Sequence, residues 1–391
     1  MFNISYGGEE KYTSALGYWL FNKNFDVTVL GSTLAGISCT RLSGTTSKVV
    51  EKQLNTQKPQ NTKTIHPPYL IYVLSRLFLV LLWVGKLIQI HRKHPITLIH
   101  AQDTGYGGLA AIIASRIMKI PVIISSHGIR HKTIAPSLQG RFNNLLLRLE
   151  YCLDLFTVKR ANITVAVNPF IKEYYSQLTN KDIRFIPIPI EVEKFKFSRQ
   201  NREQIRKELG ISESLVTIGF VGRFTPEKNF MMLIDSFARI STELPSLRLI
   251  VIGTGPLEES ARNLVVEKRV QDKVVFAGVR TDVERWLSAI DIFVLPSLTE
   301  GMSTSLLEAM SCERAVVCSD IPANRALLLN NKDALLINPL QPKDFENAIM
   351  RLSKDETLRS NLSLNAKKKA ASYDEDSVFP LVENCYAELA S

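Results

Sequence analysis

Two carboxylates stand close together in the stretch Glu300-Gly-Met-Ser-Thr-Ser-Leu-Leu-Glu308, directly after the apolar run 291–296. The apolar run predicts a buried strand, and the residues after it predict a loop followed by a helix that begins near Thr304 and Ser305. The apolar residues Leu306, Leu307, Ala309 and Met310 are expected on the inner side of that helix. The backbone N–H groups of a first helical turn lack intrahelical partners and favour anions, so this turn predicts an anion site.

A carboxylate beside an anion site is electrostatically unfavourable if the ligand is phosphate alone. It becomes favourable if the ligand also offers hydroxyl groups, as a nucleoside diphosphate sugar does. In that interpretation Glu308 binds the ribose and Glu300 the sugar, while the helix start receives the pyrophosphate. Taken singly, Glu308 is better explained as a solvent-facing helix residue and Glu300 as a loop charge.

Cations follow another predicted strand, 217–222. Gly222 allows close backbone approach, and Arg223 and Lys228 flank the turn into the next helix, which suits a diphosphate. The alternative is a pair of solvated surface cations. Gly253-Thr-Gly255 follows the strand predicted over 247–253, but it is too short for a dinucleotide fingerprint and indicates only a tight turn.

These loops belong to two series of short, β-branched apolar runs separated by helical patterns. The first series is 26–30, 97–100, 121–125, 163–167 and 183–187, and the second is 217–222, 247–253, 274–277, 290–295, 315–318 and 334–337. Such runs predict parallel sheets covered on both faces, and two series predict two doubly wound α/β domains. A polar, charged break lies at 190–212.

Composition and residue spacing argue against several classes of function. The 391 residues carry a formal charge of +10, but no nucleic-acid-binding motif is present, so nucleic acid is not expected as a partner. The five cysteines form no Cys-x-x-Cys and the six histidines no metal-binding pair, so we expect neither a disulfide framework nor a metal. No secretory signal is visible, which favours the cytoplasm.

The apolar segment 69–90 is about as long as a membrane span, yet Arg76 and Lys86 interrupt it. We expect a buried or amphipathic helix. The alternative is peripheral contact with the cytoplasmic membrane face, where the positive charge would help. Residues 43–68 are polar and aperiodic, and predict a long mobile loop that could cover an acceptor.

Together, Glu300-x7-Glu308, Gly222-Arg223-x4-Lys228 and Gly253-x-Gly255-Pro-Leu resemble the family-4 retaining glycosyltransferases of GT-B fold. The resemblance is strong over 215–345 and runs in order over the rest. It implies two Rossmann-like domains facing a central cleft, an acceptor-side domain over 1–195 and a nucleotide-sugar-binding domain over 196–372. A helix over 373–391 is expected to pack back on the first domain.

The resemblance also implies roles. Arg223 and Lys228 would hold the donor diphosphate and stabilise the leaving nucleotide, Glu300 would bind the transferred sugar, and Glu308 the ribose. The amides of Thr304 and Ser305 would bind the distal phosphate. The donor set implied by the resemblance further includes Gly222, Arg280, which lies where the family receives the base, and the loop residues Gly301, Met302 and Ser303.

In the first half, His127 in Ser125-Ser-His-Gly128 resembles the family's strand-end histidine, which lines the sugar and acceptor side. Gly7-Gly8-Glu9 resembles its glycine loop near the donor phosphates. Two features depart from the family. Almost no chain precedes Gly7 to form the usual supporting strand, so we expect the first strand to be missing. The segment 186–191 replaces the usual Pro-Asn-Gly, so no role is transferred to it.

We therefore expect a metal-independent enzyme that moves a hexose from a UDP- or GDP-linked sugar to a hydroxyl of a glycan, lipid-linked or polysaccharide acceptor, forming an α-linkage. Two alternatives remain: a nucleotide-sugar epimerase on the same fold, and a non-catalytic partner that binds nucleotide sugar beside another transferase. The sequence identifies neither the sugar nor the acceptor.

Overall fold

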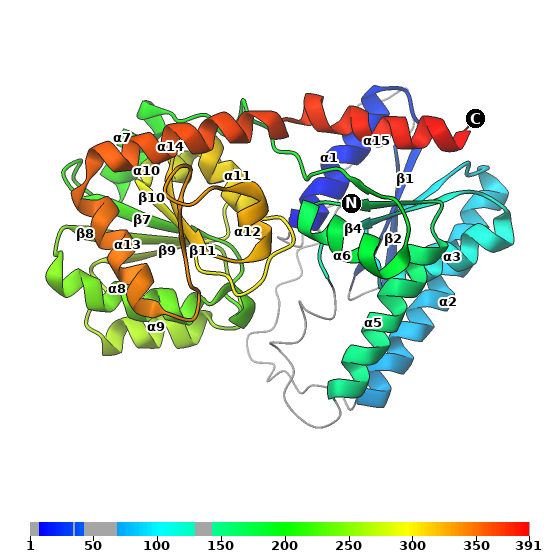
Figure 1. Cartoon of the computed structure of the whole chain (residues 1–391), viewed down its shortest axis with the longest axis horizontal. Coiled ribbons are helices and arrows are strands. Elements are labelled where there is room, and N and C mark those ends of the chain that lie inside the picture. The colour runs from blue at the N-terminus through cyan, green and yellow to red at the C-terminus, as the bar shows by residue number, and fades with distance from the viewer. Residues whose placement is uncertain (1–7, 34–35, 43–68, 130–142, 391) are drawn as a thin grey trace. The chain divides into compact units, whose positions relative to one another are not determined.

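The computed structural model describes residues 8–33, 36–42, 69–129 and 143–390 (Figure 1). Its contacts divide the chain into two compact units. The first comprises residues 1–126, 140–165 and 383–391, and the second 127–139 and 166–382. The segment before Gly8, where we expect the supporting strand to be missing, and the predicted loop 43–68 lie outside the described residues.

The second unit is built on a six-stranded sheet in the order β12-β11-β10-β7-β8-β9, in which every pair is parallel. The strands are β7 (Val216–Val221), β8 (Leu247–Ile252), β9 (Val274–Gly278), β10 (Ile292–Leu295), β11 (Ala315–Ser319) and β12 (Leu335–Ile337). All six runs predicted for the second series are strands of this one sheet. Relative to β7, the order is that of a doubly wound nucleotide-binding sheet.

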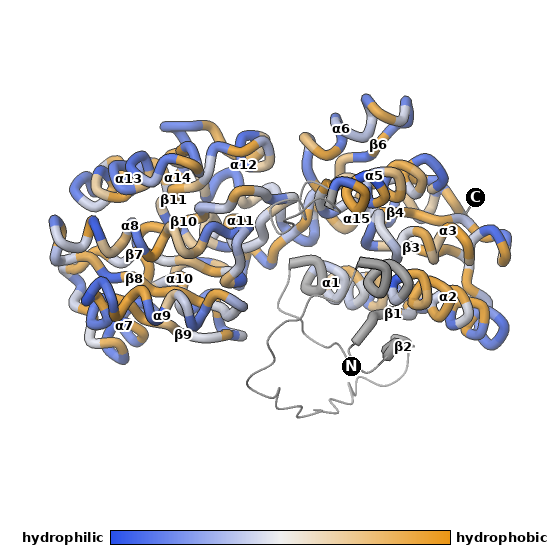
Figure 2. Tube along the Cα trace, turned by 90° about the horizontal axis from the view of Figure 1, so that it is seen from below, coloured by the Kyte–Doolittle hydropathy of each residue, from blue (hydrophilic) through white to orange (hydrophobic). Residues whose placement is uncertain are grey.

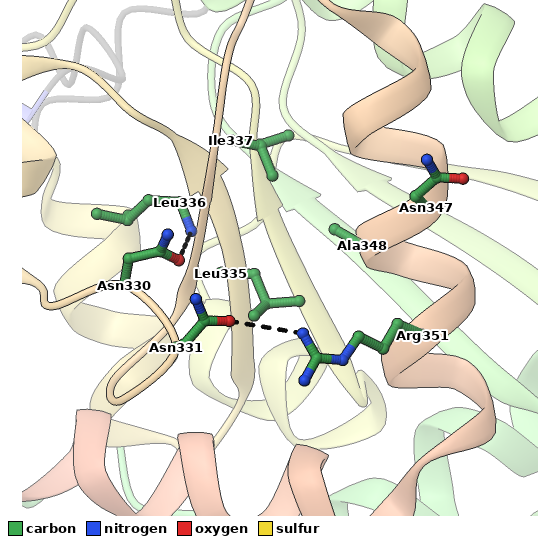
Figure 3. Close-up of a pocket in the computed structure, with 8 residues that line it drawn as sticks. All are labelled: Asn330, Asn331, Leu335, Leu336, Ile337, Asn347, Ala348 and Arg351. Carbon is green, nitrogen blue, oxygen red and sulfur yellow. Dashed lines mark hydrogen bonds between the residues drawn. The ribbon is translucent and has the colours of Figure 1, made fainter.

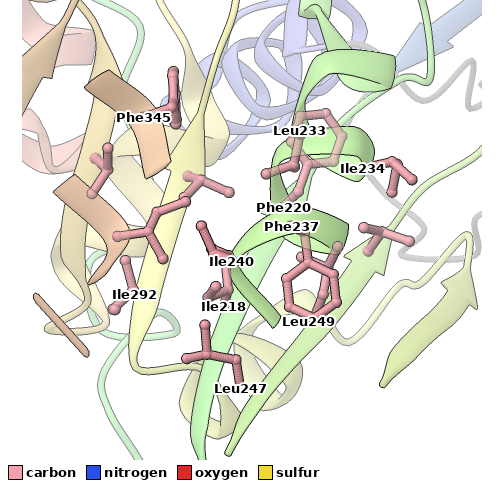
Figure 4. Packing of buried hydrophobic residues seen from close by; sticks show 14 of the residues in the cluster. Ile218, Phe220, Leu233, Ile234, Phe237, Ile240, Leu247, Leu249, Ile292 and Phe345 are labelled. Carbon is pink, nitrogen blue, oxygen red and sulfur yellow. The ribbon is translucent and has the colours of Figure 1, made fainter. Parts of the chain in front are cut away.

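Helices cover both faces of the six-stranded sheet, because successive strand residues point to opposite sides. One core contains Ile218 and Phe220 of β7 with the inner sides of α8, α9 and α13 (Figure 4). The other contains Phe293 and Leu295 of β10 with α7, α10 and α11. The helices of this unit are α7 (Arg199–Glu208), α8 (Phe230–Glu243), α9 (Glu258–Glu267), α10 (Val283–Ala289), α11 (Thr304–Ser311), α12 (Pro322–Leu327), α13 (Pro342–Lys354) and α14 (Glu356–Ala370), with the 3-10 turns η2 (Pro226–Lys228) and η3 (Ala371–Tyr373).

A four-stranded sheet in the order β3-β4-β5-β6 begins in the first unit, and its β3–β4 pair is parallel. Its strands are β3 (Ile99–Ala101), β4 (Val122–Ser126), β5 (Ile163–Ala166) and β6 (Ile183–Phe185), and the helices beside them in the chain are α1 (Gly8–Asn22), α2 (Tyr69–Lys93), α3 (Tyr106–Met118), α5 (Asn143–Arg160) and α6 (Pro169–Thr179). The boundary between the two units lies within β5, after Val165. The sequence predicts a domain boundary further along the chain, at residue 195.

The strand predicted over 26–30 exists, but it does not join a parallel sheet. It forms β1 (Val27–Thr33), which pairs antiparallel with β2 (Gly36–Leu42) in a separate two-stranded sheet. A strand followed so soon by another can pair with it through a short connection, whereas a parallel pair needs a long crossover. The sequence prediction missed β2.

The helix α15 (Glu375–Ala390) begins in the second unit, and its residues from Glu383 onward belong to the first. There the Tyr386 hydroxyl hydrogen-bonds with Nδ1 of His100 at 2.6 Å, and Nε2 of His100 hydrogen-bonds with the Ser125 hydroxyl at 2.8 Å. The end of the chain is thereby fixed to the ends of β3 and β4.

Candidate donor-binding site

The strand order of the second unit reverses between β7 and β10, because β8 and β9 lie on one side and β11 and β12 on the other. At such a reversal the loops that leave the carboxyl ends of the two central strands diverge and open a crevice, where ligands of doubly wound sheets bind. The two loops here are the ones that the sequence singled out. One carries Arg223 and Lys228, and the other carries Glu300.

Two glycines hold the loop after β7 against its neighbour. Gly253 has φ +133°, and a Cβ there would lie 2.0 Å from the Gly222 carbonyl oxygen. A Cβ on Gly255 would lie 2.5 Å from the Phe224 carbonyl oxygen. The sequence interpreted Gly253-Thr-Gly255 as a tight turn only. The structure gives it the further role of letting the backbone at 222–224 approach closely.

The loops after β7 and β10 are joined by two interactions. The Leu298 amide donates to the Glu227 carbonyl oxygen at 2.8 Å. The Lys228 ammonium donates to Oε1 of Glu300 at 2.6 Å, with only 18% and 8% of the two side chains exposed. Partial burial strengthens such a pair, since less water competes for the charges. The structure thus brings Lys228 and Glu300 together across 72 residues of chain.

The helix α11 begins at Thr304, as predicted. Ser303 is its N-cap, and the Ser303 hydroxyl accepts from the Leu306 amide at 3.3 Å. The amides of Thr304 and Ser305 lie in the first turn, whose N–H groups have no partner within a helix. The first turn of α11 therefore lies where the sequence predicts an anion site, and the binding of an anion there stays a prediction.

Glu308 lies one turn further along α11 and is buried, with 3% of its surface exposed. This excludes the solvent-facing interpretation of Glu308. A buried carboxylate is costly unless polar groups or a ligand compensate it. Leu306, Leu307, Ala309 and Met310 are also buried, as expected.

Three buried hydroxyl oxygens belong to the loops or strand ends of the same carboxyl edge. They are those of Thr225, Ser297 and Ser319, and within the described residues none of the three has a hydrogen-bond partner. Buried polar atoms are nearly always satisfied in proteins, so such exceptions mark a place where a ligand or water completes the bonding. The sequence prediction missed all three, because isolated serines and threonines carry no pattern.

Arg223 is largely exposed, with 62% of its side chain accessible, and Nη2 lies 3.5 Å from Oε1 of Glu227. Glu227 is itself only 16% exposed. It was not among the predicted residues, although it precedes Lys228. Through its carbonyl and its carboxylate, Glu227 contacts both the loop after β10 and the predicted diphosphate ligand Arg223.

Arg280 follows β9. Its guanidinium donates twice to Asp282, at 2.9 and 3.0 Å, and stacks over Trp286 at 4.9 Å. The hydrogen bond to Asp282 raises the pKa of Arg280, and the same bond lowers the pKa of the Asp282 carboxyl. The Gly278 carbonyl accepts from the Gly253 amide at 2.8 Å, which places this loop next to the glycine turn after β8. The side chain of Arg280 is thus already bound within its own loop.

The other residues that the sequence predicts for the site are His127, Gly301, Met302, Gly7 and Gly8. His127 belongs to the second unit, where its carbonyl lies so close to Gly301 that a Cβ on that glycine would be 1.6 Å away. Met302 accepts a hydrogen bond on its sulfur from the Ile188 amide at 3.2 Å. Gly8 is the first residue of α1 in the first unit, and Gly7 lies outside the described residues.

A small open pocket of about 220 Å³ lies elsewhere, beside the edge strand β12 and α13 (Figure 3). Asn331 accepts there from Arg351, and no predicted site residue lines the pocket. In the parts of the chain that the structure describes, no three His, Cys, Asp or Glu residues are grouped to hold a metal ion.

Comparison with known protein families matches nearly the whole chain. The model described as "Glycosyltransferase Family 4" matches residues 6–194, and the one described as "Glycosyl transferases group 1" matches residues 201–369. The chain belongs to glycosyltransferase family 4. The family resemblance seen in the motifs of the second half is thereby confirmed, and so is the assignment as an enzyme.

One curated relative of this glycosyltransferase is the UDP-Gal:α-D-GlcNAc-diphosphoundecaprenol α-1,3-galactosyltransferase of Escherichia coli, which is 26% identical over 294 residues and covers 73% of each chain. Among solved structures, sucrose-phosphate synthase from Thermosynechococcus elongatus matches with a TM-score of 0.76 at 17% identity, covering 98% of this chain and 94% of that one. The Anabaena protein HepE in complex with UDP-glucose matches with a TM-score of 0.67 at 20% identity, covering 78% and 82%. These structures confirm the GT-B fold, and family membership makes the enzyme a retaining transferase that uses nucleotide sugars.

Proposed function

We propose that this glycosyltransferase moves a hexose from a UDP-linked or GDP-linked sugar to a hydroxyl of a glycan or lipid-linked acceptor, forming an α-linkage. The observation that carries the proposal is the Lys228–Glu300 pair at the point where the strand order reverses, beside the first turn of α11. A cation, a carboxylate and free amides together match the phosphates and hydroxyls of such a donor.

The donor would lie across the carboxyl edge of the six-stranded sheet. The amides of Thr304 and Ser305 would receive the distal phosphate, and the buried Glu308 would accept hydrogen bonds from the ribose hydroxyls. Glu300 would accept from the sugar, while Gly301, Met302 and Ser303 would line the donor between them. Gly222 and Arg280 would contact the nucleotide or its phosphates.

Catalysis would come from charge stabilisation. As the bond between C1 of the sugar and the phosphate oxygen breaks, negative charge accumulates on the departing nucleoside diphosphate. Lys228, Arg223 and the α11 amides would stabilise it, and such preorganised groups contribute strongly to enzymatic rates. The acceptor oxygen bonds to C1, and its proton passes to the leaving phosphate or to water. His127 would line the sugar and acceptor side.

The Lys228–Glu300 pair must open when the donor binds. Lys228 would exchange the Glu300 carboxylate for a phosphate oxygen, and Glu300 would exchange an ammonium for sugar hydroxyls. A nucleoside diphosphate without sugar would leave Glu300 with no new partner. We therefore expect the complete donor to bind more tightly than the nucleotide alone.

The lipid-linked acceptor is the preferred class. The E. coli relative acts, by its name, on a diphosphoundecaprenol-linked sugar, and the first unit of this chain is strongly basic. No redox cofactor or metal is part of this proposal.

The test is thermal-shift binding against UDP, GDP, ADP and their common sugars, on the natural chain, Glu308→Gln and Glu346→Gln. Glu346 is the matched control, because it is also a buried helix carboxylate, at 2% exposure, but it pairs with Arg239 and Lys343 on α8 and α13. We expect the nucleotides of one base and their sugars to raise the melting temperature of the natural chain. Glu346→Gln should keep this shift, and Glu308→Gln should lose it.

Turnover then separates the remaining alternatives. Release of nucleoside diphosphate with acceptor, and an α-anomeric product by NMR, are expected. Conversion of the donor to another sugar isomer without acceptor would indicate an epimerase. Nucleotide binding without any turnover would indicate a non-catalytic partner, and no binding of any nucleotide would overturn the proposal.

A further inference from the structure

The helix α2 exposes an apolar face in the first unit. Leu77, Phe78, Leu81 and Leu82 are 43%, 60%, 69% and 42% exposed. Leu77 and Leu81 are four residues apart, as are Phe78 and Leu82, and Phe78 and Leu81 are three apart. Such spacings place residues on one side of a helix, so the four form a single ridge. The opposite side of α2 is buried, where Val80 and Val84 pack with residues of α3. Figure 2 shows the apolar character of α2 along the helix.

Basic residues continue the same face. Arg92 and Lys93 are exposed and lie in the last turn of α2. Each follows Leu81 or Leu82 by eleven residues, which is close to three helical turns, so it points the same way as the ridge. Cations at the end of an apolar ridge suit a lipid surface, because long Lys and Arg side chains reach the head groups while the apolar side chains beside them enter the bilayer.

The charge of the whole unit supports an anionic partner. The first unit holds 17 of the 48 Lys and Arg residues but only nine of the 38 Asp and Glu residues, and therefore carries +8 of the chain's formal charge of +10. The second unit, although longer, carries only +2. Anionic lipid head groups attract basic segments within about a Debye length of the membrane surface.

We propose that α2 docks this glycosyltransferase on the surface of an anionic lipid bilayer, with the ridge of Leu77, Phe78, Leu81 and Leu82 inserted at the head-group level and Arg92 and Lys93 among the lipid phosphates. The helix lies on the bilayer and does not cross it: no helix in the described ranges is long and apolar enough to span a membrane. This docking surface shares no residue with the proposed donor site, and the proposal does not depend on the proposed reaction.

A lipid surface fits better than a second copy of the chain. A symmetric dimer through this face would bring the same surface of two subunits together, and with it two units of charge +8. Like charges facing each other at an interface are unfavourable. An anionic bilayer instead offers opposite charge to the cations and an apolar interior to the ridge.

The test is flotation of the full chain with vesicles of phosphatidylcholine alone and of phosphatidylcholine with phosphatidylglycerol, without nucleotide. We expect recovery with the anionic vesicles only, and a decrease as salt is raised. The double variant Phe78→Ser, Leu81→Ser should partition about tenfold less well, because two large apolar side chains no longer enter the bilayer. Arg92→Glu, Lys93→Glu should lose the preference for anionic vesicles.

The matched control is Val266→Ser, Leu364→Ser, which removes two apolar side chains exposed by 63% and 45% on α9 and α14 of the second unit. It should float like the natural chain. Failure of the natural chain to float, or an equal loss in this control, would overturn the proposal. So would a dimer in light scattering that Phe78→Ser, Leu81→Ser dissociates. Nucleotide-dependent thermal shifts of the ridge variants should be unchanged, so the outcome is separable from that of the proposed function.

Discussion

At the residue scale, the donor site consists of charges that already have partners. Lys228 pairs with Glu300 and Arg223 with Glu227. A diphosphate sugar supplies a better partner to each group, because phosphate oxygens suit the cations and hydroxyls suit the carboxylates. The site is therefore held in shape before the donor arrives, and the donor replaces contacts rather than ordering a loop.

Replacing Lys228 with alanine should lower kcat by roughly two orders of magnitude, as expected for the loss of one group that stabilises the transition-state charge. Lys196→Ala is the control, since Lys196 pairs with Glu193 on the surface. Steady-state kinetics with a donor and acceptor identified in the binding screen provides the measurement. A near-normal kcat in Lys228→Ala would remove this lysine from the catalytic machinery.

Glu227 acts through Arg223 and is a positioning residue. Glu227→Gln keeps the backbone bond to Leu298 but removes the charge opposite Arg223, so kcat/KM for the donor should fall by less than about tenfold. Combined with Arg223→Ala, it should add nothing to the effect of Arg223→Ala alone. Additive effects in this double-mutant cycle would show that Glu227 works independently of Arg223.

At the scale of elements, the sheet edge opposite the donor site is fixed by a buried arginine. Arg206 of α7 is 1% exposed and donates to Asp291 at 2.6 Å and to the carbonyl oxygens of Ser212, Leu215 and Ala289. The Thr217 amide donates to the same Asp291 carboxylate at 2.7 Å. Burial lowers the pKa of Arg206, and Asp291 opposes that effect. These bonds anchor α7 to the starts of β7 and β10, whose other ends carry the site.

Arg206→Ala should therefore lower the free energy of unfolding by about 2–4 kcal/mol. It removes one of the two charged partners of Asp291, which keeps Arg202 at 2.9 Å, and it takes a buried donor away from three carbonyl oxygens. Arg199→Ala is the control, as Arg199 lies on the same helix but is 86% exposed. Urea denaturation measures both. Equal, small losses in the two variants would mean that the network contributes little to stability.

The start of α15 should make stability depend on pH. Burial, with the neighbouring Glu191, Asp374 and Asp376, raises the pKa of Glu375 to about 7, from an ordinary value of 4.5. The folded chain therefore retains a proton that the unfolded chain loses, and the contribution of Glu375 to stability falls as pH rises from about 4.5 to about 7. Glu375→Gln should flatten this part of the profile of Tm against pH and raise Tm at pH 8. An unchanged profile would contradict the prediction.

The elements of the second unit, and the strand-end loops where the donor site is proposed, could be predicted from the sequence, because strand runs, helix starts and strand-end loops are local patterns. The side-chain pairs could not. Lys228 and Glu300 are 72 residues apart, and Arg206 and Asp291 are 85 apart, so only the strand order brings them together. The β1–β2 hairpin was missed because Gly36–Leu42 lacks a continuous apolar run. The exposed ridge of α2 was not separable from a buried helix, since periodicity alone does not say which apolar side chains find a partner.

At the scale of the whole molecule, the two units divide charge and ligand unequally. The first carries most of the net charge, whereas every described residue of the proposed donor site belongs to the second. A ligand stabilises only the structure that binds it, by about 2.7 kcal/mol when its concentration is 100 times Kd. A chain with two compact units is also not expected to unfold in a single two-state step.

Scanning calorimetry of the full chain should therefore resolve two transitions, of which the matching nucleotide sugar raises only one. Arg206→Ala identifies the transition of the second unit. The hydrogen bonds of Arg206 lie wholly within that unit, so the variant should lower the temperature of that transition alone. Glu308→Gln should remove the ligand-induced shift without merging the transitions. If the donor raised both transitions together, the first unit would contribute directly to donor binding, as the resemblance of Gly7-Gly8 to the family's glycine loop implies, and the donor site would extend beyond the second unit.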